Sequence, residues 1–203
     1  MDQEKLDISS RLAAWVTNNI KYIAIGAIIG VAIPLLWNFQ QYRIEQKNIS
    51  ASDIYYELIN LANTPEETQQ LAEKIFENHE DSVYETLAKF ILSKKEFENK
   101  NYDLSKKYLE DIIKINHNEA YVSLAYIKIS LILIENKDYD NALLFLDKVK
   151  PKESFQHILS EIKGDIYNFK GDKAQSLLHY NKALEASAID NENLLMKRNF
   201  VKD

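Results

Sequence analysis

The hydrophobic positions of this chain form one continuous block near the amino end and a periodic pattern over the remainder. The block covers residues 22–42, YIAIGAIIGVAIPLLWNFQQY, and contains no charged residue. At about 1.5 Å of rise per residue, a helix of this length reaches roughly 31 Å, which matches the hydrocarbon core of a bilayer. The block therefore predicts a transmembrane helix. Aromatic residues lie at or near both ends of the block, as they do at the headgroup level of membrane helices: Trp15 and Tyr22 at one end, and Trp37, Phe39 and Tyr42 at the other.

Three other structures could produce a similar block. A cleaved secretory signal needs a small-residue triplet after its apolar core. The nearest match, Gly30-Val31-Ala32, is followed by further apolar residues that would stay on the mature chain. A helix lying on the membrane surface has one apolar stripe, whereas this block is apolar all round. A buried helix of a soluble domain rarely lacks charge over such a length. We therefore expect an uncleaved anchor.

The charged residues on the two sides of the block weakly favour one orientation of the anchor in the membrane. Lys5, Arg11 and Lys21 precede the block, and Arg43 and Lys47 follow it closely. Because cytoplasmic flanks carry the excess of lysine and arginine, we expect a cytoplasmic amino end and a translocated carboxy-terminal part.

Two glycines inside the block could contact another helix. Gly26 and Gly30 form a GxxxG pair, which lets a second membrane helix approach closely. Small residues are common in membrane helices in any case, so the sequence leaves open whether the neighbour is another protein or a second copy in a homodimer.

Beyond the block, amphipathic runs alternate with short polar turns that recur. Residues 98–103, ENKNYD, return as 135–140, ENKDYD, and a related segment, NFKGD, covers 168–172. Matching Ser105, Ala142 and Ser176 in the runs that follow gives spacings of 37 and 34 residues. Thirty-four residues is the period of tetratricopeptide (TPR) repeats, so this part of the chain resembles stacked pairs of antiparallel helices. Scarce glycine and proline agree with helices joined by short connections.

The predicted fold is all-α: a single amino-terminal transmembrane helix, a TPR-like solenoid of helical hairpins and a carboxy-terminal capping helix. In chain order, we expect a head over residues 1–21, the span over 22–42, a juxtamembrane helix with a degenerate leading helix pair over 43–82, three units over 83–189 and the cap over 190–203. The three units would cover residues 83–117, 118–151 and 152–189.

The three units match the TPR pattern unequally. The third fits best, with Gly164 where the paired helices cross and Tyr167 at the aromatic position. The first departs from the pattern, because Glu96 stands at the place of Tyr167. In the second, the apolar run of residues 119–136 could be mistaken for a membrane span. Lys128 interrupts it, and we expect a central solenoid helix packed on both sides.

Both ends of the predicted solenoid carry helix signals. Thr64, Pro65 and Glu67 predict a helix start with a capping box. At the other end, Asp190 and Asn191 precede ENLLMKRNFV. There we expect three apolar residues to cover the last unit while two basic ones face water: Leu194, Leu195 and Met196, then Lys197 and Arg198.

Composition and charge argue against several function classes. The chain carries net −6, of which residues 1–47 contribute net +1, so the remainder carries net −7 and is a poor nucleic-acid binder. Cysteine is absent, the four histidines lack metal-ligand spacing, and no glycine-rich loop can hold a phosphate. We predict no metal, no cofactor and no enzyme activity.

The expected function is binding, because stacked helix pairs expose the first helix of each pair along a groove. The corresponding positions are apolar in the first two units and more polar in the third. A groove that is apolar at one end and acidic at the other suits an extended, partly unfolded or basic polypeptide. The positions are Leu87, Phe90, Leu124, Ile127, Leu131, Glu161, Asp165, Asn168 and Phe169. The alternative is that the apolar members pack against the leading or capping helices.

The order of these parts resembles the YfgM family of bacterial inner-membrane proteins. The matching segments are the GAIIGVAIPLLW span, the NFQQYRIEQKNISASDIYYELINL juxtamembrane helix and EIKGDIYNFKGDKAQSLLHYNKAL. The resemblance implies a single-pass anchor, a periplasmic TPR domain, association with the SecYEG translocon and partnership with a membrane-anchored prolyl-isomerase-like chaperone. It implies an ancillary, chaperone-like role for exported polypeptides. A membrane-tethered regulator that sequesters a signalling protein is the alternative, and a reversed orientation would favour it.

Overall fold

The computed structural model describes residues 2–60, 64–115, 118–187 and 191–202, and every regular element in these ranges is a helix. The all-α prediction is therefore confirmed for this part of the chain. The predicted unit boundaries at 117 and 189, and Asp190, lie outside it. The chain divides into two compact units, Met1–Ser50 and Ala51–Asp203.

The first unit consists of most of one long helix, α1 (Asp2–Asn60), which runs through Pro34 without a break. Among the described residues, it is the one helix long and apolar enough to cross a membrane, and its most apolar stretch is entirely unburied. Ile28, Leu36 and Trp37 are each about two-thirds exposed. Apolar side chains with no protein cover need another apolar environment, which agrees with the predicted anchor and not with a buried soluble helix.

The second unit begins with the last turns of α1. Ala51 and Leu58 are buried there. Leu58 belongs to one core cluster with Ala72 and Ile75 of α2 (Pro65–Asn78). The predicted capping box is confirmed, because Glu67 N–H donates to Thr64 Oγ1 at 3.1 Å and Thr64 N–H donates to Glu67 Oε2 at 3.2 Å.

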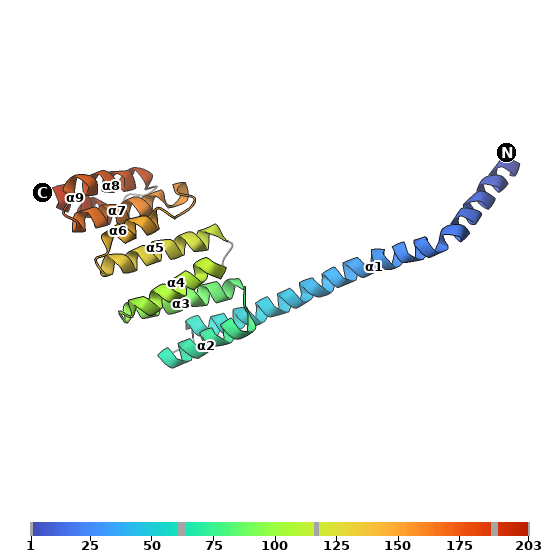
Figure 1. The fold of residues 1–203 in the computed structure, drawn as a ribbon, viewed down its shortest axis with the longest axis horizontal. Helices are drawn as coiled ribbons and strands as arrows, with labels where there is room; N and C mark the ends of the chain where they lie inside the picture. Colours follow the sequence, from blue (N-terminus) through green and yellow to red (C-terminus); the bar gives the residue numbers. More distant parts are fainter. Residues whose placement is uncertain (1, 61–63, 116–117, 188–190, 203) are drawn as a thin grey trace. The chain divides into compact units, whose positions relative to one another are not determined.

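Three helix pairs follow, each packed on its neighbours in chain order (Figure 1). They are α3 (Val83–Glu98) with α4 (Tyr102–Ile115), α5 (Glu119–Glu135) with α6 (Tyr139–Leu146), and α7 (Gln156–Phe169) with α8 (Lys173–Ala186). A short 3-10 helix, Glu153–Phe155, precedes α7. As expected from its all-round apolar sequence, α5 lies in the central core, with Ile129 fully buried and Ile132 nearly so.

The recurring polar turns have one shared backbone geometry. Lys100, Lys137 and Gly171 hold φ values of 61°, 59° and 78°. In each turn, the N–H of the next residue donates back across the helix end, to Glu96, Leu133 and Tyr167 O at 2.8, 2.8 and 2.9 Å. This left-handed closure satisfies carbonyl groups at the end of the first helix and reverses the chain. It explains why a similar short sequence motif recurs between the two helices of every pair.

Small residues allow the paired helices to approach closely. Ser105 Oγ donates to Ser93 O at 2.7 Å in the first pair, and Ser176 Oγ donates to Gly164 O at 2.9 Å in the third. A Cβ on Gly164 would lie 2.5 Å from Tyr180 Cδ1, so only glycine fits there without movement.

The capping helix α9 (Glu192–Lys202) covers the last pair, as expected for Leu194 but not for Met196. Leu194 and Val201 are buried with Tyr180 and Ala183, whereas Met196 is 63% exposed. The expectation for Met196 is wrong because the face of α9 that packs on α8 runs from Leu194 to Val201, seven residues apart and so on one side of a helix.

Candidate partner-binding surface

The residues predicted to line a groove in the first two pairs have unequal access to solvent. Leu124 and Leu131 of α5 are 37% and 40% exposed, while Leu87 and Phe90 of α3 are half-buried. The Phe90 ring lies 6.4 Å from that of Tyr121. These four remain predicted partner contacts.

Ile127 differs from its predicted neighbours. Its side chain is 5% exposed and belongs to the central core with Ile129 and Ile132. A partner on the surface cannot reach a side chain that the protein already covers, so we assign Ile127 to the core instead of the groove.

A cavity of about 150 Å³ opens between α3, α4 and α5. Its floor consists of buried residues: Ser93, Ser105, Leu109 and Ile132. Its mouth consists of more accessible ones: Lys94, Phe97, Lys128 and Leu131. The two serine hydroxyls are hydrogen-bonded to each other at 3.0 Å, so the floor presents mainly apolar surface to an incoming group.

Two lysines give the mouth of this cavity a positive charge. Lys94 is an exposed residue whose ammonium lies 3.7 Å from Glu98 Oε1. Lys128 is half-buried, and the described residues provide it with no hydrogen bond or ion pair. Burial, and then the nearby charge of Lys94, lower the pKa of Lys128. In the sequence, Lys128 stands out only as an interruption of an apolar helix, although a lone charge on such a helix is a signal that it faces an opening.

A broader hollow lies at the start of α3. Its volume is about 520 Å³, and it is lined by Asp81, Ser82, Val83, Thr86, Ile115, Asn118 and Tyr121. Tyr121 lines this hollow and its ring also contacts the ring of Phe90. The hollow leaves no signal in the sequence, because its lining comes from connecting residues and helix ends that are far apart along the chain.

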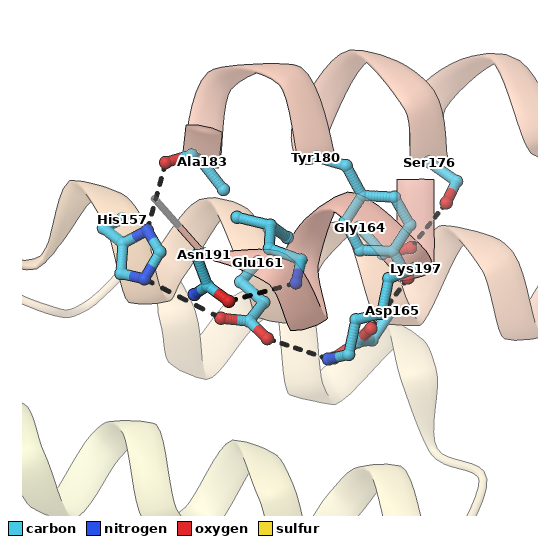
Figure 2. Close-up of polar contacts among 10 residues, drawn as sticks. His157, Glu161, Gly164, Asp165, Ser176, Tyr180, Ala183, Asn191 and Lys197 are labelled. Carbon is cyan, nitrogen blue, oxygen red and sulfur yellow. Dashed lines mark hydrogen bonds and ion pairs between the residues drawn. The ribbon is translucent and has the colours of Figure 1, made fainter. Parts of the chain in front are cut away.

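The acidic residues expected at the other end of the groove are already paired within the protein. Lys197 Nζ of α9 donates to Glu161 Oε1 and Asp165 Oδ2, each at 2.8 Å, and Tyr180 Oη donates to Asp165 Oδ1 at 2.7 Å (Figure 2). His157 Nε2 also lies 3.9 Å from Glu161 Oε2. The expectation of an open acidic end, and of Lys197 facing water, is therefore wrong, because α9 places its cation between the two carboxylates.

Electrostatics agree with this ion-pair cluster. Burial alone would lower the pKa of Lys197, but its hydrogen bonds to Asp165 and Glu161 outweigh that effect and raise it. Burial, and then the hydrogen bond to Asp165, raise the pKa of the Tyr180 hydroxyl well above its usual range. The cluster thus fixes the cap onto α7 and leaves little negative charge for a basic partner.

The last predicted groove residue, Phe169, is 57% exposed and stacks on Tyr139 with ring centroids 5.9 Å apart. On α1, an added Cβ at Gly26 or Gly30 would meet nothing within 4 Å, so this face of the first unit is open to another helix.

No cluster of three or more histidine, cysteine, aspartate or glutamate side chains suited to a metal occurs in the described part of the chain. His179 instead stacks on Tyr167 with ring centroids 5.3 Å apart. Its Nδ1 is buried without a hydrogen-bond partner. Burial, and then the charges of Lys182 and Lys163, lower its pKa.

Protonation of His179 should therefore oppose folding. Below pH 6.5, the ordinary pKa of histidine, His179 takes up a proton in the unfolded chain but resists protonation in the folded chain. The free energy of unfolding should therefore fall as the pH falls from 6.5 toward the lowered pKa of the folded state. Urea unfolding at pH 7.5 and 5.8 should show a smaller loss for His179→Phe, which keeps the ring stack. An identical pH dependence in both proteins would contradict this assignment.

Comparison with known proteins gives two matches. The profile of the tetratricopeptide repeat-like domain family matches residues 13–202. A curated relative, named as an ancillary SecYEG translocon subunit of Aggregatibacter actinomycetemcomitans, is 23% identical over 188 residues, which cover 92% of each chain. The resemblance predicted from the order of the parts is confirmed by these matches.

Proposed function

The chain belongs to the tetratricopeptide repeat-like domain family. We propose that it is a membrane-anchored scaffold working beside the SecYEG translocon. In this role it binds exported polypeptides or a partner chaperone and catalyses no reaction. The observation that carries the proposal is the similarity to the ancillary translocon subunit over 92% of both chains, which includes the anchor as well as the helix pairs.

The parts of the molecule suit this role. Within α1, residues 22–42 cross the inner membrane once, residues 1–21 stay in the cytoplasm, and the domain that follows lies in the periplasm. Because the anchor holds the domain at the membrane, the domain has a high local concentration at the site where chains emerge from the translocon. The open face at Gly26 and Gly30 is where a helix of the translocon, of a membrane-anchored prolyl-isomerase-like chaperone or of a second copy would pack.

The orientation can be tested cleanly because the chain contains no cysteine. We expect Lys107→Cys, on exposed α4 surface, to react with a membrane-impermeant maleimide in spheroplasts, and Ser10→Cys to react only after lysis. The opposite pattern would contradict the export role and favour the alternative, a regulator that sequesters a cytoplasmic signalling protein.

The partner can be tested in the same membranes. Crosslinking of the intact protein followed by mass spectrometry should recover SecY, SecE or SecG above the level seen with a control lacking residues 1–42. Equal recovery with and without the anchor would contradict a specific place beside the translocon.

A further inference from the structure

We propose that the cavity between α3, α4 and α5 receives one apolar side chain of a bound polypeptide, while Lys94 and Lys128 at its mouth bind a carboxylate that neighbours this side chain. The preferred ligand is thus an extended segment in which an acidic residue adjoins a large apolar one. The proposal rests on the polypeptide-binding role above and specifies the chemistry of the segment that is bound.

The cavity has the size and surface for one side chain. A volume of about 150 Å³ is enough for a benzene-sized group. Leu109 and Ile132 at its floor are at most 2% exposed, so an entering phenyl or isobutyl group would meet a rigid apolar surface. Leu131 at the mouth is 40% exposed and would be covered by the main chain of the ligand.

Lys128 determines the charge of the ligand. A half-buried ammonium without a carboxylate partner has lost part of its hydration and gained no compensating contact. The second ammonium of Lys94 adds to the unfavourable charge, which is consistent with the lowered pKa of Lys128. A carboxylate placed between the two would relieve both effects, and a basic residue there would be repelled.

The remainder of the domain argues for the same choice of ligand. The carboxylates of Glu161 and Asp165, which could have attracted a basic segment, are paired with Lys197. A phospholipid acyl chain is far longer than a cavity of this volume can hold. A polypeptide side chain is the occupant that satisfies both size and charge.

The test uses the full chain in lipid nanodiscs and three fluorescein-labelled peptides with identical Gly/Ser flanks. Their central residues are Leu-Phe-Glu, Leu-Phe-Lys or Ser-Ser-Glu. By fluorescence anisotropy, we expect the first peptide to bind at least about tenfold more tightly than either of the others, which is the factor for one charge-assisted hydrogen bond or one buried aromatic side chain.

Two variants of the cavity lysines and one control variant assign the effect. Lys128→Met keeps an apolar stem of similar length and should weaken binding of the Leu-Phe-Glu peptide about tenfold. Lys107→Met removes an equally charged but exposed residue of α4 outside the cavity and should leave binding unchanged. Lys94→Glu, at an exposed position, should shift the preference toward the Leu-Phe-Lys peptide.

Equal affinity for the acidic and basic peptides, or unchanged binding by Lys94→Glu, would overturn the proposal. So would binding of sodium dodecanoate with none of the peptides, since this would assign the cavity to a free acyl chain. Crosslinking to the translocon distinguishes the two proposals: if it persists while peptide binding fails, only the ligand chemistry is wrong. If peptide binding holds while crosslinking fails, the place beside the translocon is wrong.

Discussion

Replacing Gly164 with alanine is expected to lower the free energy of unfolding of the helix-pair domain by about 2–3 kcal/mol. The added Cβ would lie 2.5 Å from Cδ1 and 2.6 Å from Cε1 of Tyr180, far inside van der Waals contact. Tyr180 is 1% exposed, and its hydroxyl donates to Asp165, so the ring cannot move aside without breaking this bond. The full chain in detergent micelles, unfolded by urea and followed by circular dichroism, should show the loss as a lower midpoint.

The other two pairs provide the control for Gly164. Tyr180 lies 16 positions after Gly164, the small residue at which the paired helices cross. The other two pairs have a serine at the crossing position and a leucine 16 positions later: Ser93 with Leu109, and Ser130 with Leu146. The double substitution Gly164→Ser and Tyr180→Leu recreates this combination. It should be less destabilised than the sum of its single changes by at least about 1 kcal/mol. Strict additivity would show that the ring and the glycine do not constrain each other.

The helix pairs could be predicted from the sequence because their turns are determined locally. Each turn depends on one residue with positive φ, which is Lys100, Lys137 or Gly171, and on backbone hydrogen bonds between residues close in the chain. The same short motif therefore recurs at each of these turns. The charge-free block in α1 is equally local, since the length of an apolar run is sufficient to indicate a span.

The binding surface was harder to predict because it depends on which face of each helix its neighbours cover. Ile127 and Leu131 lie four residues apart in one apolar helix, yet the first is 5% and the second 40% exposed. As a basic residue of an amphipathic helix, Lys197 is expected in water, but its partners Glu161 and Asp165 lie more than thirty positions away. Contacts between distant segments leave no periodic signal in a single sequence.

Breaking the buried ion pair in α3 should destabilise the domain more than any surface charge change. Lys89 Nζ donates to Glu85 Oε1 at 2.7 Å, and Asp81 N–H donates to Glu85 Oε2 at 2.8 Å. The two side chains are only 11% and 6% exposed. Glu85→Gln would turn an amide N–H toward one of these donors and leave the Lys89 charge buried beside the Phe76 ring without its counter-ion. We expect a loss of about 3 kcal/mol in urea unfolding, the magnitude typical of removing one partner from a buried pair.

The same helix contains a matched exposed pair that isolates the effect of burial. Lys94 and Glu98 have the same four-residue spacing, but their side chains are 72% and 62% exposed. Glu98→Gln should therefore cost less than about 0.5 kcal/mol. In the background of Lys89→Met, which removes the buried cation, Glu85→Gln should cost markedly less than in the parent chain, because only the contact with Asp81 is then weakened. A similar cost for Glu85→Gln and Glu98→Gln would mean that water reaches the Glu85–Lys89 pair, and that packing alone holds α3 in place.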